Sequence, residues 1–404
     1  MLVACPMLML VLLAEPVPTT PPEAVGISSQ RLVRLKAMMQ SEVDRGHIGS
    51  AIGLVARQGK IVFLEAVGEH APGVAITPSA IVRLASSAKS FTAAATMVLY
   101  EEGKLRLDDP VADYIPAWVD AKVTVTDPGL GAATLVEPSR PVTIRDLLTH
   151  ESGIDVASDA FEQAWRATES STTTLDLAER MARIPMVAHP GTRWDYGYYG
   201  SNYEILAAVL EQASGMTLEA LFQEKLFKPL GMEDSYFFVP DGKAQRLSAI
   251  YQMRDGQLSI KRPAGEESER STFLSGGGGV RSTIADFHRF CQMLLNGGVV
   301  DDVRILSPKS VQMMMTDHAG PELQPFGDAE YGWGFGATVR RQVKDGDIGS
   351  AGTYAWNGGT GTAFWIDPKE DLIGIVFAPY WPPAHNELRK KFEVGMYQAV
   401  VSIR

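Results

Sequence analysis

Near the start of the chain, hydrophobic positions predict one helix followed by a β-hairpin. Apolar residues recur at helical spacing from Leu32, and Ser28 can cap a helix that extends to about Arg45. Two short apolar runs follow, at residues 52–55 and 61–64, and a turn sequence with a glycine separates them. This order is typical of two antiparallel strands that pair with each other.

The middle of the chain has mainly helical patterns. Thr143 and Asp146 form a capping box that opens a helix over residues 144–150. Helical spacing then continues to about residue 265, with Pro, Gly and Thr clusters between the segments. The predicted helices are 161–165, 175–184, 202–214 and 218–226.

In the last third of the chain, strands and helices are both predicted. Four consecutive glycines, 276–279, predict a turn before a helix over 284–295. Strands are expected at 363–366 and 372–377, and a final helix at 387–401. We therefore expect a sheet with flanking helices that is assembled from both ends of the sequence, with a helical insertion in between.

Together these patterns predict a two-lobed molecule of the α/β (α+β) class. The α/β lobe with the sheet comprises residues 23–142 and 270–404, and the mainly helical lobe comprises residues 143–269. Residues 1–22 are an apolar N-terminus and a linker. A cleft between two such lobes is a usual place for a binding site.

The N-terminus resembles a signal segment. Residues 1–14 form an apolar run that is too short to span a bilayer, and Pro-rich residues 15–22 follow it. This order favours export to the periplasm over a cytoplasmic location, and no stable membrane span is expected. Cys5 lies in this run and Cys291 in a segment with helical periodicity, so we expect no disulfide between them.

The composition is that of an ordinary soluble globular chain, with 45% hydrophobic and 21% charged residues among 404. The net charge of -11 repels a phosphate backbone, so no nucleic acid partner is expected. The seven histidines form neither a His-x-x-x-His motif nor a cluster with cysteine. We therefore expect no metal site and no cofactor.

Ser86 and Lys89 carry the most informative motif, because no other serine in the chain precedes a lysine by three positions. On a helix the two residues share a face, so an amine can lie beside the hydroxyl that must lose its proton. Such a pair makes serine a nucleophile. The predicted helix is mostly apolar and ends at Gly103, so a lysine inside it needs a polar reason to be there.

Two further segments are candidates for the same site. The glycine-rich segment 355–362 contains Gly358 and Gly359, and the N–H groups of Ser86 and Gly359 could stabilise an oxyanion. The alternative is a bulged edge strand without a ligand. The aromatic segment 190–202 offers a phenol that could protonate a leaving group, or it could only form the floor of a pocket.

These three segments, in this order, resemble the serine hydrolases related to class C β-lactamases, penicillin-binding proteins and family VIII carboxylesterases. The resemblance extends from about Pro22 to the C-terminus. It implies a β-lactamase/transpeptidase-like fold with Ser86 as the acylated nucleophile and Lys89 as its base. Sequences that resemble the family framework lie at 105–111, 143–150, 229–232 and 276–280.

The resemblance also implies a catalytic tyrosine. Counting back from Glu211 and Gly215 in the following helix aligns Tyr198 with the tyrosine of the family's Tyr-x-Asn motif. Counting forward from residues 190–191 aligns Tyr196 instead. We prefer Tyr198, because loop length varies more readily than helix register, and Tyr196 stays the alternative.

Two departures from the family's β-lactamases indicate the substrate. Gly200 stands where they carry an asparagine that helps to hold an amide, and Trp356 stands where they carry the lysine of Lys-Thr-Gly. An indole offers one neutral donor and cannot attract a carboxylate as that lysine does. We therefore predict a serine carboxylesterase that cleaves small, neutral, short-chain esters, with Trp356, Gly358, Gly200 and Tyr196 in contact with the substrate.

Several alternatives remain open on the sequence. The nearest is a β-lactamase or D-amino-acid peptidase of the penicillin-binding protein type. A second is a sensor that is acylated and never turns over, and a third is a noncatalytic binding module. His150 as a base in a Ser–His arrangement is a weaker alternative, because it ends a predicted framework helix. The lack of a Gly-x-Ser-x-Gly motif argues against an α/β-hydrolase.

Overall fold

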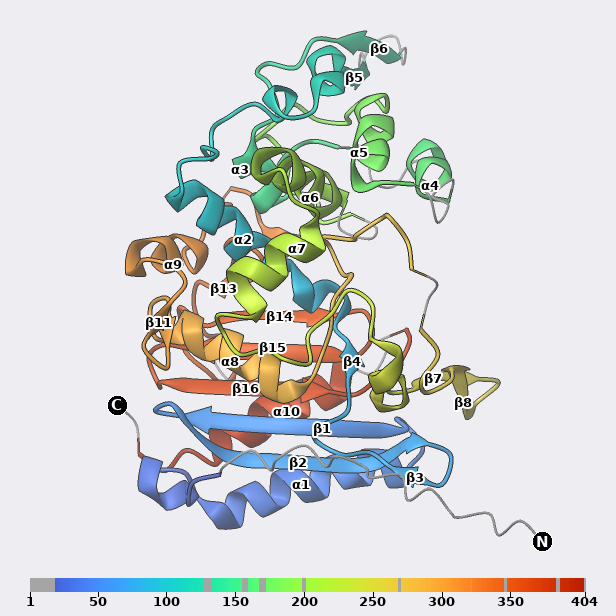
Figure 1. Ribbon diagram of the computed structural model, residues 1–404. Coiled ribbons are helices and arrows are strands. Elements are labelled where there is room, and N and C mark those ends of the chain that lie inside the picture. The colour runs from blue at the N-terminus through green and yellow to red at the C-terminus, as the bar shows by residue number, and fades with distance from the viewer. Residues whose placement is uncertain are drawn as a thin grey trace, which may run out of the picture.

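An eight-stranded antiparallel sheet joins the two ends of the chain in this computed structural model (Figure 1). The N-terminal strand β1 pairs with the C-terminal strand β16, as the sequence patterns predict. In their order across the sheet, the strands are β12 (Tyr331–Trp333), β13 (Thr338–Arg340), β14 (Tyr354–Gly358), β15 (Thr362–Asp367), β16 (Leu372–Phe377), β1 (Ser50–Arg57), β2 (Lys60–Ala71) and β3 (Val74–Ala75). The structure describes residues 19–126, 133–154, 159–166, 172–197, 201–267, 270–320, 322–344, 347–382 and 386–402.

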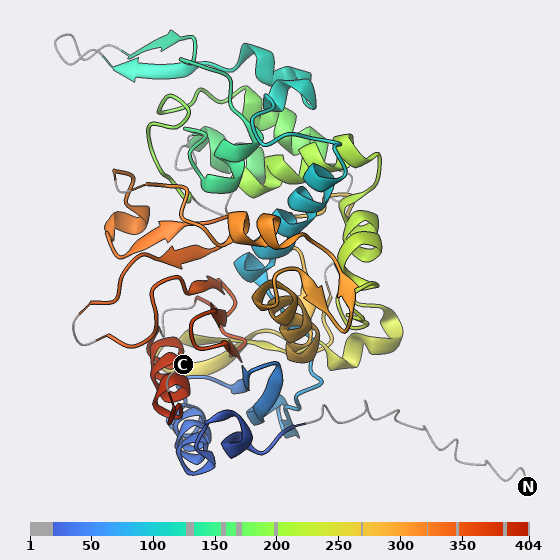
Figure 2. The same cartoon turned by 90° about the vertical axis from the view of Figure 1, so that its left-hand side faces the viewer.

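Helices cover both faces of this sheet. Alternate side chains of each strand point to opposite sides, and the apolar side chains on both sides are buried against helices. On β1, Ile52 and Leu54 belong to one hydrophobic cluster, whereas Ala51 and Val55 belong to another. The first cluster includes side chains of α2 and α8, and the second includes side chains of α1 and α10, which lie side by side (Figure 2). These helices are α1 (Ser29–Asp44), α2 (Lys89–Glu101), α8 (Ile284–Leu295) and α10 (Asn386–Gln398).

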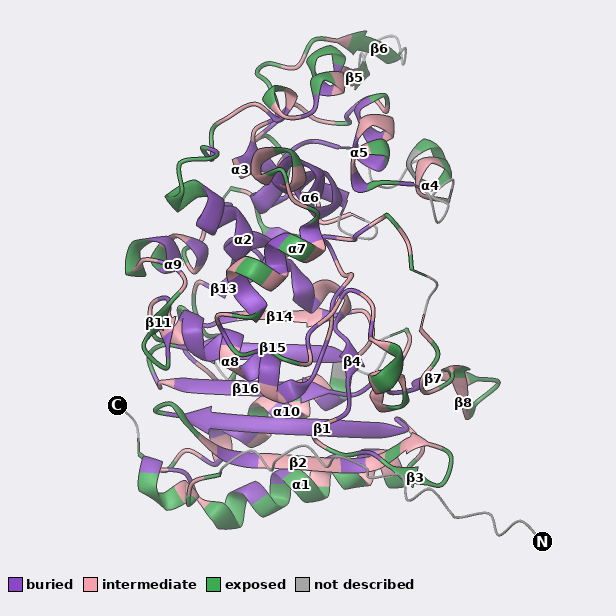
Figure 3. Cartoon of the chain, in the orientation of Figure 1, coloured by how far each residue is buried: buried purple, intermediate pink, exposed green. Residues whose placement is uncertain are grey.

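Helix α2 is buried between the sheet and the other helices (Figure 3). The Phe91 ring lies edge-on to Phe290 and Phe227, with centroids 4.5 and 5.3 Å away. Burying one such side chain stabilises the fold by about 2 kcal/mol. The remaining helices are α3 (Ile144–Thr149), α4 (Asp159–Arg166), α5 (Thr174–Ala182), α6 (Ser201–Ser214), α7 (Leu218–Phe222) with the π-helical turn η5 (Gln223–Phe227), and α9 (Pro308–Met314).

Two hairpins connect to parts of the molecule far from them in sequence. In the hairpin of residues 123–126 and 133–136, Val123 forms a β-bridge with Met186, beside the helices. In the hairpin of residues 250–254 and 257–262, Tyr251 forms a β-bridge with Tyr380, next to the sheet. The division of the chain into an α/β lobe and a mainly helical lobe of residues 143–269 remains a prediction. The short strands are β4 (Val82–Arg83) with β9 (Arg281–Ser282), β5 (Val123–Thr126) with β6 (Ala133–Val136), β7 (Ile250–Arg254) with β8 (Gln257–Arg262), and β10 (Val299–Val300) with β11 (Val303–Arg304).

Local capping signals predict the ends of several helices correctly. The Ser28 side chain accepts a hydrogen bond from the backbone of Arg31 at the start of α1, and Thr143 and Asp146 form the expected capping box of α3. The strands β12 and β13 have three residues each and were not expected from the sequence.

Across the described part of the chain, no single helix is both long and apolar enough to cross a membrane, although the bent pair Ser201–Ser214 and Leu218–Phe227 meets these criteria together.

The end of β14 lies against the turn that carries Ser86. Thr362 donates a hydrogen bond of 2.7 Å to the Leu84 carbonyl, and its hydroxyl lies 2.9 Å from the Ser87 hydroxyl. A Cβ atom on Gly358 would lie 2.1 Å from the same Leu84 oxygen, so this position requires glycine. The glycine-rich segment is thus a strand end packed on the Ser86 turn.

We expect Gly358→Ala to lower the free energy of unfolding by about 1–3 kcal/mol, because the new methyl group must push β14 away from Leu84. Urea unfolding measures this loss. Gly242→Ala is the control, since a Cβ atom there has no heavy atom within 4 Å and should change stability by less than about 0.5 kcal/mol. Equal stability of the two variants would contradict the close approach.

Candidate active site

Ser86 lies in the 3₁₀ turn η2 (Ala85–Ala88), which leads directly into α2. The preceding residue, Ala85, has a φ angle of 46°, a left-handed conformation that costs a residue with a side chain about 1–2 kcal/mol. Surrounding contacts must maintain such strain, and it often occurs at functional sites. The strain lies one residue before the predicted nucleophile.

The Lys89 amine contacts Ser86, as the motif predicts. Its Nζ atom lies 3.2 Å from Ser86 Oγ and donates a hydrogen bond of 2.8 Å to the Gly277 carbonyl. The Lys89 residue is fully buried in α2. No carboxylate among the described residues lies within ion-pair distance of this amine. The hydroxyl and the carbonyl are therefore the polar reason for a lysine inside an apolar helix.

A buried carboxylate holds the loop that binds Lys89. Glu204, on α6, accepts hydrogen bonds from the Ser275 hydroxyl and from the backbone N–H groups of Gly276 and Gly277, at 2.7, 2.9 and 3.2 Å. Burial raises the pKa of Glu204 to about 7, although these donors and the charge of Lys89 oppose the shift. Sequence reasoning missed this residue, because position 204 only continues the helical pattern of α6.

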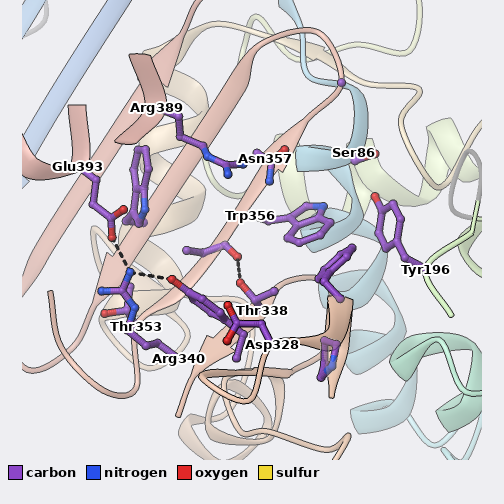
Figure 4. A pocket seen from close by; sticks show the side chains of 16 residues that line it. Ser86, Tyr196, Asp328, Thr338, Arg340, Thr353, Trp356, Asn357, Arg389 and Glu393 are labelled. Carbon is purple, nitrogen blue, oxygen red and sulfur yellow. Dashed lines mark hydrogen bonds and ion pairs between the residues drawn. The ribbon is translucent and has the colours of Figure 1, made fainter. Parts of the chain in front are cut away.

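Tyr196 brings a phenol to the same place. Its ring centroid lies 5.0 Å from Lys89 Nζ, and its hydroxyl points toward Ser86 (Figure 4). Backbone hydrogen bonds position the segment, since Asp195 donates to the His150 carbonyl and Gly191 donates to the Glu151 carbonyl. Tyr198 and Gly200, which the sequence also indicated, lie outside the described residues.

His150 lies behind Tyr196 in an aromatic cluster. Its imidazole centroid is 4.9 Å from those of Tyr196 and Trp333, and its Nδ1 atom lies 3.2 Å from the Asn202 amide. Burial lowers the pKa of His150 well below its usual value, and the charge of Lys89 lowers it further. His150 does not line the cavity that contains Ser86, so its contacts favour a packing role.

A cavity of about 560 Å³, named here the aromatic cavity, opens beside Ser86 and Gly359 (Figure 4). Tyr196, Trp356 and Phe326 line its near part, and the Trp356 ring lies 5.1 Å from Tyr196 and 5.6 Å from Phe326. The far part is polar and charged. Its charged lining residues are Asp328, Arg340, Arg389 and Glu393, of which Arg340 and Glu393 form an ion pair of 2.8 Å.

The chain matches known proteins over most of its length. A sequence model of the family described as Beta-lactamase matches residues 35–394. The chain belongs to this family. Its fold is the β-lactamase/transpeptidase-like fold that the motifs implied, and the family is one of serine hydrolases.

Relatives within the β-lactamase family carry more than one activity in their names. Lovastatin esterase of Penicillium rubens is 29% identical, and the match covers 83% of this chain and 90% of that protein. An Escherichia coli K12 protein provisionally named D-alanyl-D-alanine carboxypeptidase is 27% identical, with 93% and 88% covered. The solved structure of EstCE1, a hydrolase with promiscuous acyltransferase activity, superposes with a TM-score of 0.77 at 24% identity and covers 91% of this chain and 99% of its own.

Glu204→Gln tests the role of the buried carboxylate. An amide has one oxygen for three donors, so at neutral pH the variant should lose about 2 kcal/mol of unfolding free energy. Because the folded pKa of about 7 exceeds the ordinary 4.5, the native protein binds this proton more tightly than the unfolded chain. The stability contributed by this proton is fully present below pH 4.5 and is lost as pH rises through about 7.

Urea unfolding of both proteins across this pH range measures the effect. The stability difference between wild type and Glu204→Gln should shrink as pH rises, since every other titrating group is shared and cancels. A constant difference would contradict the raised pKa of Glu204.

Proposed function

We propose that this protein is a serine carboxylesterase that forms an acyl-enzyme on Ser86. The observation that carries the proposal is the 3.2 Å contact between Ser86 Oγ and Lys89 Nζ, beside a cavity that Gly359 and Tyr196 also line. A nucleophile, a base, an oxyanion donor and a phenol thus meet at one place. This set of groups is sufficient for acyl transfer without a metal or an organic cofactor.

In the acylation step, Ser86 Oγ attacks the ester carbonyl carbon while the Lys89 amine takes the hydroxyl proton. The oxyanion receives hydrogen bonds from the backbone N–H groups of Ser86 and Gly359. Collapse of the tetrahedral intermediate breaks the bond to the alcohol oxygen. Tyr196 protonates that oxygen and regains its proton from Lys89, so the alcohol leaves as a neutral molecule.

In the deacylation step, a water molecule attacks the acyl carbon of Ser86. The Lys89 amine accepts a proton from this water by way of the phenol. The bond between the acyl carbon and Ser86 Oγ then breaks, and the amine returns the proton to Oγ, which leaves as a hydroxyl. The carboxylic acid is released, and the enzyme returns to its starting state. Positioning and electrostatic stabilisation supply the rate, because Lys89 is buried and its hydrogen bonds hold it beside Ser86 before substrate binds.

The proposed substrates are short-chain esters that are neutral where they contact Trp356. The indole occupies the wall of the aromatic cavity with Phe326 and Tyr196, so it offers stacking rather than charge. A family relative named as an esterase at 29% identity supports an ester over an amide. The size of the cavity, about 560 Å³, leaves room for a bulky alcohol.

Ser86→Ala should lower the turnover of p-nitrophenyl butyrate by about a million-fold and abolish labelling by a fluorophosphonate. Wild-type protein should turn this ester over faster than nitrocefin or a D-alanyl peptide. Unchanged turnover in Ser86→Ala would overturn the mechanism, and faster turnover of the amides would overturn the ester preference. A burst of one equivalent without a steady state would identify a sensor.

Phenylalanine variants of the two tyrosines test which phenol acts. Tyr196→Phe should lower kcat for ethyl butyrate, measured by released ethanol, by about 10²–10⁴-fold with little change in KM, because the ethoxide leaving group needs this proton donor. Tyr198→Phe is the matched control and should change kcat by less than about tenfold. The opposite pattern would assign the role to Tyr198, as the register of the following helix favours.

A further inference from the structure

A second cavity, of about 340 Å³, lies on the other side of the Ser86 turn and is named here the basic cavity. Its lining includes Ala85, the residue before Ser86, and Thr360, the residue after Gly359. The two cavities are therefore lined by consecutive residues of the same two segments, 85–86 and 359–360. Four of the residues that line the basic cavity are cationic, namely Arg83, Lys261, Arg262 and Arg281.

The cationic residues of this cavity lie on three strands, β4, β8 and β9. Arg83 and Arg281 face each other directly across β4 and β9, a like-charge arrangement that destabilises a strand pair unless acceptors compensate it. Arg83 donates to the carbonyls of Ser248 and Glu266, and Arg281 forms an ion pair of 2.6 Å with Glu267. The Nε atoms of both arginines are buried and have no acceptor among the described residues.

The charge balance differs between the two cavities. The aromatic cavity has two cationic and two acidic lining residues, and one cation and one acid form an ion pair. Among the described residues that line the basic cavity, none is acidic. Burial, and the charge of Arg281 after it, lower the pKa of Arg83 to about 10. An anion placed in the basic cavity would relieve this repulsion.

The Trp381 ring lies close both to Gly359 and to the cationic side chain of Lys261. A Cβ atom on Gly359 would lie 3.0 Å from the Trp381 ring, and Lys261 Nζ lies 5.0 Å from the centroid of the same ring. Lys261 is exposed at the end of β8. The same indole ring therefore contacts the position of Gly359, a proposed oxyanion donor, and lies under the Lys261 amine.

The direction of the two ester arms follows from the proton donor. The acyl chain and the alcohol extend to different sides of the carbonyl carbon that Ser86 attacks. Tyr196 lines the aromatic cavity and protonates the alcohol oxygen in the proposed mechanism, so the alcohol arm lies in that cavity. On the other side of the carbonyl carbon, the basic cavity is the one lined by Ala85 and Thr360, the neighbours of Ser86 and Gly359.

We propose that the preferred acyl arm ends in a carboxylate, which the basic cavity binds through Lys261 and the neighbouring arginines. The substrate class is then a half-ester of a short dicarboxylic acid. This inference rests on the proposed esterase function and adds the charge of the acyl group to it. The alcohol arm stays uncharged, in agreement with Trp356.

The test compares monoethyl adipate with ethyl hexanoate, two esters of equal acyl length that differ in a terminal carboxylate. The readout is the ratio of their kcat/KM values, measured by released ethanol. Wild type should prefer the adipate, and the ratio should fall as salt is raised. Lys261→Ala should lower the ratio about fivefold, as expected for one partly exposed ion pair, and Lys261→Glu should lower it further.

Lys60→Ala is the control with the same charge change. Lys60 is the first residue of β2 and does not line the basic cavity. The opposite end of β2 is the one near that cavity, because Glu69 and His70 accept hydrogen bonds from Tyr251 and Ala249, the neighbours of Ile250. The control should keep the wild-type ratio. Equal ratios in Lys261→Ala and Lys60→Ala would overturn the acyl-arm proposal while leaving the esterase intact. Absence of turnover for both esters, with no labelling of Ser86, would overturn the esterase function itself.

Discussion

The site depends on one constraint: an amine buried in an apolar helix must find polar partners inside the protein. Lys89 finds them in the Ser86 hydroxyl and the Gly277 carbonyl, at 3.2 and 2.8 Å. A buried polar group without such partners would cost several kcal/mol, so the position of the glycine loop is coupled to the position of the amine. Glu204 completes the arrangement, because its carboxylate holds the N–H groups of that loop. Ser86, the proposed nucleophile, is therefore positioned by elements from three distant parts of the chain.

The same logic explains why β14 ends where it does. A strand can place a backbone N–H beside Ser86 only if no side chain intervenes, and Gly358 meets this condition against Leu84. Hydrogen bonds from Thr360 and Thr362 to the carbonyls of Arg83 and Leu84 then fix the strand end to the turn. The proposed oxyanion donors are thereby held in place before any substrate arrives, which is the condition for strong electrostatic catalysis.

Membership of the β-lactamase family gives the fold and the class of chemistry, but it leaves the substrate open, because relatives within one fold act on different molecules. Substrate choice then depends on the walls around the shared centre. Here one wall is aromatic and balanced in charge, and the other is cationic. Position 356 is a tryptophan, and the cations lie in the basic cavity with Trp381, so in the proposed function the positive charge contacts the acyl arm and not the alcohol arm.

The sequence alone determined what depends on neighbouring residues. Caps at Ser28 and Thr143 located helix starts, short apolar runs located the central strands, and the three-residue spacing of Ser86 and Lys89 indicated their shared face. Tertiary structure decided the rest. Glu204 has no local signature, and the three-residue strands β12 and β13 are too short for a periodic signal. Tyr196 lies near Lys89 because the backbone of its segment donates hydrogen bonds to the carbonyls of His150 and Glu151. Contacts between distant segments leave no periodic trace in the sequence, since neither partner specifies the other until the chain has folded.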